Sequence, residues 1–393
     1  MKKNILFVVD EQMYGGISVV LTTLLNRMDY EKYNIDLLIL HNRGESLING
    51  NLTEKVNILY GTSFFSAIDL TISQVLKSKN LALIFHKIQI ILGLKTGWIK
   101  NKIIKERKKI LKKHYDIEIA FKDGFCALFT ALGNSNKKIS WLHTSYDVHD
   151  YTEKYRNLFK QVYEKIDKIV AITEDVSSTF NKIYNKKEKT EIIENLIDIE
   201  GVIEKSKEEN VNFSKDFINL ICVGRIAYQK AYPRLILQIA KLKEEGYMDN
   251  VILHIIGDGD DSDTVNKIIE ENNLKENINL IGYKQNPYPY IAKSDMLLLP
   301  SLYEGLGLVL IEANILGVPC FATKFANVDK TLSNGKYGLI VENSEDGIYS
   351  GLKNILKNNE IIRKYKENLI NYKYDKNEEI ITKINVLFEE KQK

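Results

Sequence analysis

Cysteine, tryptophan and proline are scarce in this chain of 393 residues, which contains 3, 2 and 5 of them. The cysteines, Cys126, Cys222 and Cys320, are widely separated and have apolar neighbours. An odd, sparse set of this kind fits neither a disulfide framework nor a zinc site, so we expect reduced thiols in the core of a cytoplasmic protein. All five prolines lie after residue 232 and both tryptophans lie before it, which favours two units with different loop chemistry.

Long hydrophobic runs are also missing. The first apolar segment covers residues 5–9 and ends at Asp10; it is too short for the core of a signal peptide and predicts a buried strand. No run reaches the roughly 18 apolar residues that a membrane-spanning helix needs. We therefore expect neither a secretory signal nor a transmembrane helix.

The chain has no strong excess of charge of either sign. It contains 55 Lys and Arg against 52 Asp and Glu, a net charge of +3, and 44% of its residues are hydrophobic. These values exclude wholesale disorder. Averaged over the whole chain, they also argue against a strongly basic nucleic-acid binder or an acidic tail protein.

That average conceals one strongly basic segment, residues 77–114. It holds twelve basic side chains against one acid, Glu106, so its net charge is +11 and the rest of the chain carries −8. Isoleucines, leucines and Trp98 are interleaved with the lysines, which is typical of a helix that lies on an anionic membrane. RNA binding and a solvated charged face are the alternatives. The twelve basic residues are Lys77, Lys79, Lys87, Lys95, Lys100, Lys102, Lys105, Arg107, Lys108, Lys109, Lys112 and Lys113.

Short apolar runs alternate with helix-length amphipathic stretches, the pattern of βα units around parallel sheets. The sequence predicts an α/β protein with two doubly wound domains, residues 1–198 and 217–370, joined by a linker at 199–216 that lacks a strong period. A final helical segment, 371–393, has an apolar face that needs a surface to cover. The predicted strands are 5–9, 35–40, 56–59, 117–121, 139–143, 168–172 and 191–195, then 220–224, 251–257, 278–282, 296–300, 320–323 and 338–341.

Ligands of such sheets bind at the carboxyl ends of the strands, and the clearest pattern there is segment 300–319. A strand ends at Pro300, a turn with Gly305, Leu306 and Gly307 follows, and a helix then begins. The free N–H groups and the positive end of that helix suit an anion such as a diphosphate.

Two carboxylates accompany this turn. Glu304 lies within it, and Glu312 lies on the helix among apolar residues. A buried carboxylate needs a partner, and a ribose diol would supply one because a carboxylate accepts from two hydroxyls at once. A capped helix with one solvated glutamate is the alternative.

Arg225 and Lys230 follow the strand that ends at Gly224. A guanidinium with an ammonium is a common means of neutralising a diphosphate, including a diphosphate leaving group. Ordinary surface charge is the alternative. After the first strand, the paired Gly15 and Gly16 would let the backbone approach a ligand; no dinucleotide fingerprint follows them, and a structural turn is the alternative.

Three other strand ends complete the set of candidates. His143 ends a strand and is equally compatible with a structural or a functional role, while Gly257 ends the strand predicted at 251–257 and Tyr283 follows the one at 278–282. The sequence has no HExxH, CxxC, P-loop or nucleophile-elbow pattern, and Asp258, Asp260 and Asp261 have no metal-ligand spacing. We expect no metal site.

Together these segments resemble the retaining nucleotide-sugar glycosyltransferases of family 4, which have the GT-B architecture of two facing Rossmann-like domains. The resemblance runs from the first strand to about residue 345 and is most specific in the E-x7-E element, Glu304 to Glu312. Gly224-Arg225 with Lys230 comes next, and Asn195 to Asp198 resembles the end of the family's first domain. Here Lys230 is followed by alanine where the family usually has glycine, and Leu306 stands where an aromatic residue is frequent.

The resemblance implies specific roles. Glu312 would bind the donor ribose, Arg225 and Lys230 the diphosphate, and Glu304 with the amides of Gly305–Gly307 the donor sugar. From the first domain, Gly16 would approach the diphosphate and His143 the sugar. The catalytic set would then be Glu304, His143, Arg225 and Lys230, with Gly15, Gly224, Gly257, Tyr283 and Leu306 among the donor contacts. The last helix would cross back to the first domain.

The sequence thus suggests an enzyme on the inner face of the cell membrane, with no cofactor except its nucleotide-sugar co-substrate and no nucleic-acid partner. It would move a hexose, with retention and without a metal, from a UDP-sugar to a lipid-linked saccharide of a capsule, exopolysaccharide or lipopolysaccharide. In this reading the segment 77–114 would dock on the anionic membrane surface. A soluble or protein acceptor, and a catalytically silent partner subunit, are the alternatives.

Overall fold

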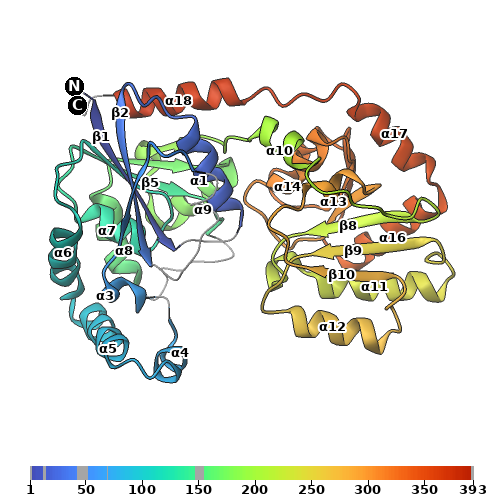
Figure 1. Cartoon of the computed structure of the whole chain (residues 1–393), viewed down its shortest axis with the longest axis horizontal. Coiled ribbons are helices and arrows are strands. Elements are labelled where there is room, and N and C mark those ends of the chain that lie inside the picture. The colour runs from blue at the N-terminus through green and yellow to red at the C-terminus, as the bar shows by residue number, and fades with distance from the viewer. Residues whose placement is uncertain (1, 12–14, 42–51, 69, 147–154, 391–393) are drawn as a thin grey trace. The chain divides into compact units, whose positions relative to one another are not determined.

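The computed structural model describes residues 2–11, 15–41, 52–68, 70–146 and 155–390. The chain divides into two compact units, which are coloured along the chain in Figure 1. The first unit is Met1–Leu196 together with Glu378–Lys393, and the second is Ile197–Asn377. We describe each unit by itself.

The first unit is built on a parallel sheet of seven strands in the order β3-β2-β1-β4-β5-β6-β7. Strand β1 is the centre: Ile5, Leu6, Phe7 and Val8 have no exposed surface. A strand covered by helices on both faces needs apolar residues at every position rather than at alternate ones. The strands are β1 (Lys3–Glu11), β2 (Tyr33–His41), β3 (Asn57–Tyr60), β4 (Ile117–Ala120), β5 (Lys137–Leu142), β6 (Lys168–Ala171) and β7 (Thr190–Ile192).

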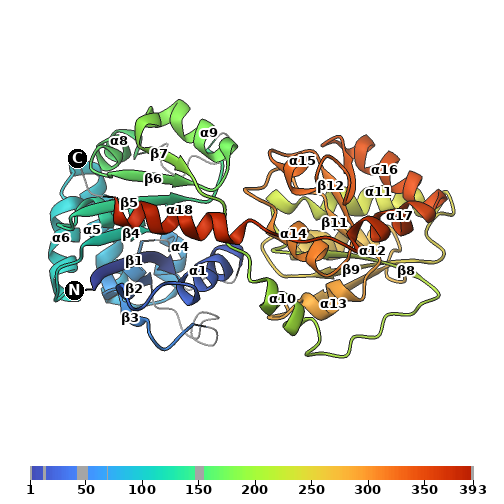
Figure 2. The same cartoon turned by 90° about the horizontal axis from the view of Figure 1, so that it is seen from above.

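The helices of this unit include one from the far end of the chain, α18 (Asn377–Glu389), which Figure 2 shows running over the first sheet. The Phe388 ring meets Phe7 and Tyr33 edge-on at 6.5 and 6.0 Å. The ammoniums of Lys3 and Lys137 bind the last carbonyls of α18, where cations stabilise a helix end. The others are α1 (Gly16–Asn26), α3 (Ser63–Ser66), α4 (Ile72–Lys77), α5 (Leu81–Thr96), α6 (Ile99–Ile110), α7 (Phe125–Ala131), α8 (Arg156–Glu164) and α9 (Glu174–Tyr184).

The second unit has a parallel sheet of six strands in the order β10-β9-β8-β11-β12-β13. Alternate residues of its strands enter two cores: Leu220 and Cys222 face one and Ile221 faces the other. The strands are β8 (Ile218–Val223), β9 (Val251–Ile256), β10 (Ile278–Gly282), β11 (Met296–Leu299), β12 (Cys320–Thr323) and β13 (Gly338–Val341).

The helices of the second unit lie on both faces of its sheet (Figure 1). They are α10 (Ile199–Lys205), α11 (Tyr232–Glu244), α12 (Ser262–Glu271), α13 (Tyr288–Ala292), α14 (Leu308–Ile315), α15 (Val328–Thr331), α16 (Glu345–Lys357) and α17 (Glu360–Leu369). Each unit also has a short 3-10 helix: η2 (Lys187–Lys189) in the first and η3 (Tyr228–Lys230) in the second.

Both sheets follow the Rossmann strand order, in which the chain reverses direction across the sheet between the first and fourth strands. The reversal falls between β1 and β4 in one unit and between β8 and β11 in the other. The predicted α/β class with two doubly wound sheets is therefore confirmed.

The linker expected at 199–216 differs from the structure, because its first part folds as α10 within the second unit. Asp198 caps this helix by accepting from the Gly201 amide at 3.2 Å, and Val202 is buried. The Asn286 side chain donates to the Lys205 carbonyl at 2.8 Å. The sequence analysis missed this capped helix because it is only one or two turns long and its residues show no clear hydrophobic period.

Candidate active site

The predicted donor-site residues of the second unit gather at the carboxyl edge of its sheet. Gly224 follows β8, Gly257 follows β9, Tyr283 follows β10, and the turn of residues 300–307 follows β11. The strand order reverses between β8 and β11, and a doubly wound sheet opens its ligand crevice at such a point.

Lys230 and Glu304, 74 residues apart in sequence, form an ion pair at this edge. The Lys230 Nζ lies 2.7 Å from the Glu304 Oε1, and the Ser301 hydroxyl donates to the same oxygen at 2.7 Å. Both charged side chains are largely buried, with 17% and 11% of their surface exposed. One oxygen of Glu304 is therefore occupied by two donors, and the carboxylate is held in one orientation.

Glu312 lies on α14 and is only partly exposed. Burial raises the pKa of its carboxyl group, and a hydrogen bond from the Tyr288 hydroxyl to Oε1, at 3.0 Å, opposes that shift. Tyr288 thus fixes one carboxylate oxygen and leaves the other able to accept a further hydrogen bond.

The glycine-rich turn presents backbone donors. No N–H group from Glu304 to Gly307 has an acceptor in the part of the chain that the structure describes. Gly307 has a φ of +69° directly before α14, a left-handed conformation that glycine adopts without strain. Four open amides beside a helix N-terminus make a preformed site for an anion or for hydroxyl oxygens.

Arg225 is exposed and makes no ion pair or hydrogen bond with any described residue. Tyr283 is 49% exposed. Gly257 has a packing role: a Cβ there would lie 1.9 Å from the Gly224 carbonyl oxygen, so the ends of β8 and β9 approach each other only with glycine at this position. Contact of these residues with a donor stays a prediction.

The remaining predicted residues belong to the first unit. His143 follows β5 and packs against the Phe121 ring at 4.8 Å. Burial lowers the pKa of His143 to about 3, against a hydrogen bond to the Phe121 backbone, so the imidazole is neutral at physiological pH. Its Nε2 has no partner among the described residues, and a neutral Nε2 is a hydrogen-bond acceptor for a hydroxyl. Gly15 and Gly16 begin α1; Met13 and Tyr14 of the same segment lie outside the described residues.

A polar cluster at the β1/β4 switch point was missed by the sequence analysis. The Lys122 ammonium pairs with Asp10 at 2.5 Å, and the Tyr146 hydroxyl donates to Asp123 at 2.8 Å. Burial raises the pKa of the Asp123 carboxyl group. Their position after the strands predicted at 5–9 and 117–121 was the signal that could have identified Asp10, Lys122 and Asp123.

Three further residues were missed in the second unit: Gln229, Arg234 and Asn343, whose side chains hold the turn of residues 300–304. Asn343 follows a predicted strand, which was a usable signal. Arg234 lies in a helix of mixed composition and Gln229 in the short 3-10 helix η3, and nothing in the sequence distinguishes them.

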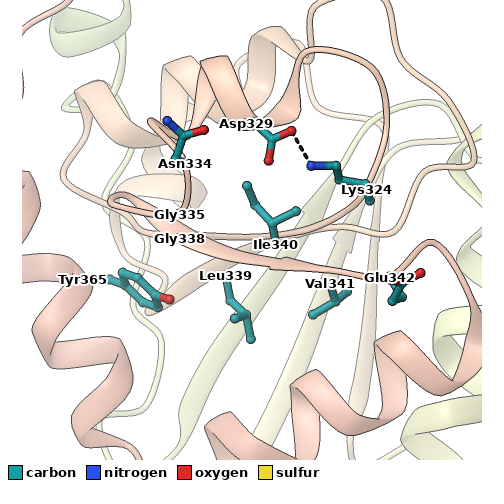
Figure 3. Close-up of a pocket in the computed structure, with 10 residues that line it drawn as sticks. All are labelled: Lys324, Asp329, Asn334, Gly335, Gly338, Leu339, Ile340, Val341, Glu342 and Tyr365. Carbon is teal, nitrogen blue, oxygen red and sulfur yellow. Dashed lines mark hydrogen bonds and ion pairs between the residues drawn. The ribbon is translucent and has the colours of Figure 1, made fainter.

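Figure 3 shows a separate pocket beside β13, the edge strand of the second sheet. Tyr365 of α17 lies on one side, and the ion pair of Lys324 with Asp329 on the other. None of the predicted site residues lines it.

Comparisons with known proteins find glycosyltransferases among both the sequence relatives and the solved structures of similar fold. Residues 203–376 match the family model of glycosyl transferases group 1. The chain is 32% identical over 180 residues to the N-acetylgalactosamine-N,N'-diacetylbacillosaminyl-diphospho-undecaprenol 4-alpha-N-acetylgalactosaminyltransferase of Campylobacter jejuni, 45% of this chain and 47% of that protein. It is 31% identical over 219 residues to the capsular polysaccharide biosynthesis glycosyltransferase CapH of Staphylococcus aureus, 53% and 59% of the two chains. The chain spans about half the length of the first curated relatives it matches.

Solved structures match over nearly the whole chain. TarM has a TM-score of 0.71 at 17% identity, with 99% of both chains covered. HepE of Anabaena, in complex with UDP and glucose, has a TM-score of 0.69 at 14% identity, with 97% and 99% covered. At these identities the likeness shows the fold, and the narrower assignment to family 4 stays a prediction. The chain thus contains a segment, residues 203–376, that matches the glycosyl transferases group 1 model, and over nearly its whole length it has the fold of these solved structures.

Proposed function

We propose that this protein is a retaining glycosyltransferase that moves a hexose from a UDP-sugar to a lipid-linked saccharide in cell-surface polysaccharide biosynthesis. The observation that carries the proposal is the Lys230–Glu304 pair beside the open amides of the turn that follows β11. A buried ammonium and oriented N–H groups suit a diphosphate, and an oriented carboxylate suits sugar hydroxyls.

Each part of the donor meets matching chemistry in the second unit. The free Arg225 guanidinium and Lys230 would hold the diphosphate, and the open oxygen of Glu312 would accept from the ribose. Two names support this donor. A relative from Escherichia coli, 29% identical over 177 residues, is named UDP-Gal:alpha-D-GlcNAc-diphosphoundecaprenol alpha-1,3-galactosyltransferase, and the structural neighbour HepE was crystallised with UDP.

In the proposed mechanism, retention of configuration needs no enzyme nucleophile. The oxygen of Glu304 that accepts from Lys230 and Ser301 is a weakened nucleophile. In the proposed step the bond from the anomeric carbon to the diphosphate oxygen breaks, and the acceptor oxygen bonds to the same face of that carbon. The acceptor proton passes to the departing diphosphate, whose growing charge Arg225 and Lys230 stabilise. These cations make a metal ion unnecessary for the step.

The lipid-linked acceptor is proposed from the relatives and from the surface of α4 and α5. The C. jejuni and E. coli relatives are named for undecaprenol-linked acceptors. On α5, Leu81, Phe85, Ile88 and Leu92 repeat every three or four residues, so they share one helix face, and they are between 50% and 81% exposed. An exposed apolar face of this kind would lie on the bilayer surface. None of the described helices is long and apolar enough to cross a membrane.

Part of the positive charge of residues 77–114 is neutralised by ion pairs within the first unit. Arg107 is buried against Glu118, Glu106 binds both Lys102 and Lys109, and Lys113 pairs with Asp36. The exposed cations that could meet anionic lipid are fewer than the twelve counted in sequence: Lys77, Lys79, Lys95, Lys105, Lys108 and Lys112.

Two experiments test the proposal. In the first, the protein is incubated with membrane extract and a panel of labelled nucleotide sugars, and the product is identified by mass. A labelled lipid-linked saccharide from a UDP-sugar supports the proposed reaction, while a soluble or protein product, or no product, contradicts it.

In the second, the affinity of the protein for anionic vesicles is compared with its affinity for RNA at matched salt, for the wild type and for the double variant Phe85→Asp with Ile88→Asp. Vesicle binding that this variant loses supports membrane docking, and an RNA preference refutes it.

A further inference from the structure

The turn that carries Glu304 is held by side chains through its backbone carbonyls. Four consecutive carbonyls, those of residues 300–303, each accept a side-chain hydrogen bond. Arg234 donates to Pro300 at 2.6 Å from Nη2 and 3.2 Å from Nε, and Asn343 donates to Leu302 at 2.9 Å. Side-chain hydrogen bonds to the backbone are common in proteins, but here they bind every carbonyl of one four-residue turn.

The other two carbonyls are bound in the same way. The Thr323 hydroxyl donates to Ser301 at 2.6 Å, and the Gln229 side-chain amide donates to Tyr303 at 2.8 Å. The Gln229 backbone carbonyl in turn accepts from the Leu302 amide at 2.9 Å. Gln229 therefore joins the turn to η3, the short helix that carries Lys230.

The donors are fixed relative to one another. Arg234 comes from α11 and Asn343 from the loop between β13 and α16, and the Arg234 Nη2 lies 2.6 Å from the Asn343 Oδ1. Asn343 also donates to the Lys324 carbonyl at 3.0 Å. Three chain segments thus meet behind the turn, with one guanidinium at their centre.

This arrangement determines where the amides of the turn point. In a trans peptide the carbonyl and the following N–H point in opposite directions, so binding the Tyr303 carbonyl directs the Glu304 N–H away from Gln229. The N–H groups of residues 304–307 have no acceptor among the described residues. The carbonyl side of the turn is satisfied and the amide side is open.

We infer that Gln229, Arg234 and Asn343 are positioning residues that orient Glu304 and the open amides toward the donor. The inference rests on the proposed donor site. Donors that are already oriented in the free protein stabilise developing charge without reorganisation during the reaction. Small displacements of such groups cost far more in rate than in binding of the rest of the ligand.

Lysine cannot replace Arg234 in this role. The guanidinium reaches two carbonyls and the Asn343 oxygen at once, whereas an ammonium is a compact charge without the planar fork. We expect Arg234→Lys to recover only part of what Arg234→Ala loses.

The test uses Arg234→Ala, Arg234→Lys and Asn343→Ala, with Arg363→Gln on the exposed surface of α17 as the matched control. Binding of UDP is measured by calorimetry, turnover by release of UDP from the donor identified above, and exposure of residues 300–307 by hydrogen exchange. We expect UDP affinity within about twofold of wild type, a kcat lowered by about 10²-fold in Arg234→Ala and Asn343→Ala with little change in KM, and faster exchange confined to the turn.

An unchanged kcat, or a parallel loss of UDP affinity, kcat and thermal stability, would overturn the positioning role. Asn343→Ala removes fewer contacts than Arg234→Ala, so it keeps the test decisive if the arginine variant fails to fold. Failure of the wild-type protein to bind UDP would instead refute the proposed donor site. Hydrogen exchange of residues 300–307 does not depend on UDP, so it still tests whether the clamp, the set of hydrogen bonds from Gln229, Arg234 and Asn343, holds the turn.

Discussion

The side-chain amide of Asn377 holds the backbone of Ile197 by two hydrogen bonds. Asn377 Nδ2 donates to the Ile197 carbonyl at 2.8 Å, and the Ile197 N–H donates to Asn377 Oδ1 at 3.0 Å. The chain passes between the two units directly beside these residues, once after Leu196 and once before Glu378. One side chain therefore holds together the first and last residues of the second unit.

Replacing Asn377 with alanine should destabilise the protein. Two buried backbone groups of Ile197 would lose their partners, at a cost of about 1–3 kcal/mol for each unsatisfied group. We expect the free energy of unfolding in urea to fall by about 2 kcal/mol or more. Asn368→Ala, which removes an exposed hydrogen bond to the Lys336 carbonyl, serves as the control; equal effects of the two substitutions would contradict the tie.

Glu304 and Glu312 should separate catalysis from binding. Glu312→Ala removes the carboxylate proposed for the ribose, and we expect UDP affinity to fall about tenfold or more. Glu304→Ala frees Lys230 for the diphosphate, so UDP affinity should be kept while kcat falls by about 10²-fold or more. Calorimetry with UDP and turnover assays measure the two effects, and small, equal losses in both variants would refute the site.

Chelation should leave the reaction intact. Arg225, Lys230 and the open amides of the turn supply the positive charge that a metal ion would otherwise bring to the leaving diphosphate. We expect full activity in EDTA, measured by UDP release. A complete loss that Mn²⁺ restores would show that the proposed mechanism lacks a component.

Glu106 should make the first unit sensitive to acid. Burial alone would raise its pKa, but hydrogen bonds from Lys109, Lys102 and Thr62 lower the pKa from 4.5 to about 2. A carboxyl group with a depressed folded-state pKa contributes stability above its unfolded pKa and loses it as the pH falls toward the folded value.

The free energy of unfolding of wild type should therefore fall between about pH 5 and pH 2 by about 1–2 kcal/mol more than that of Glu106→Gln. Urea titrations at several pH values measure this difference. The exposed Glu367→Gln on α17 should keep the wild-type pH dependence, and parallel curves for wild type and Glu106→Gln would contradict the assignment.

The C-terminal helix α18 should be required for the stability of the first unit. Phe388 is 1% exposed and packs against Phe7 and Tyr33, and truncating a buried phenylalanine typically costs about 3–5 kcal/mol. Phe388→Ala should destabilise by that amount in urea, whereas Val386→Ala on the exposed side of the same helix should change stability little. A similar loss from both variants would argue against this packing.

The sequence determined the architecture and the edges at which chemistry is found. Continuous apolar strands and amphipathic helices predicted two doubly wound sheets because a parallel sheet must bury both faces. Polar residues after strands led to the prediction of Arg225, Lys230 and Glu304 as site residues, since the carboxyl ends of parallel strands share one edge. Glu312 was predicted from its place among apolar residues of the following helix. Helix α10 was not predicted because its hydrophobic periodicity is weak, and its stability comes from the Asp198 cap and from the packing of Val202.

Only the tertiary structure decided which of these groups touch. Lys230 and Glu304 are 74 residues apart, and their pairing depends on β8 lying beside β11. The clamp formed by Gln229, Arg234 and Asn343 requires three segments to meet behind one turn. The charge of residues 77–114 is likewise shared between internal ion pairs and the surface. Hydrogen bonds and ion pairs depend on distances of a few ångströms, and sequence patterns report which face of an element is buried but carry no information about those distances.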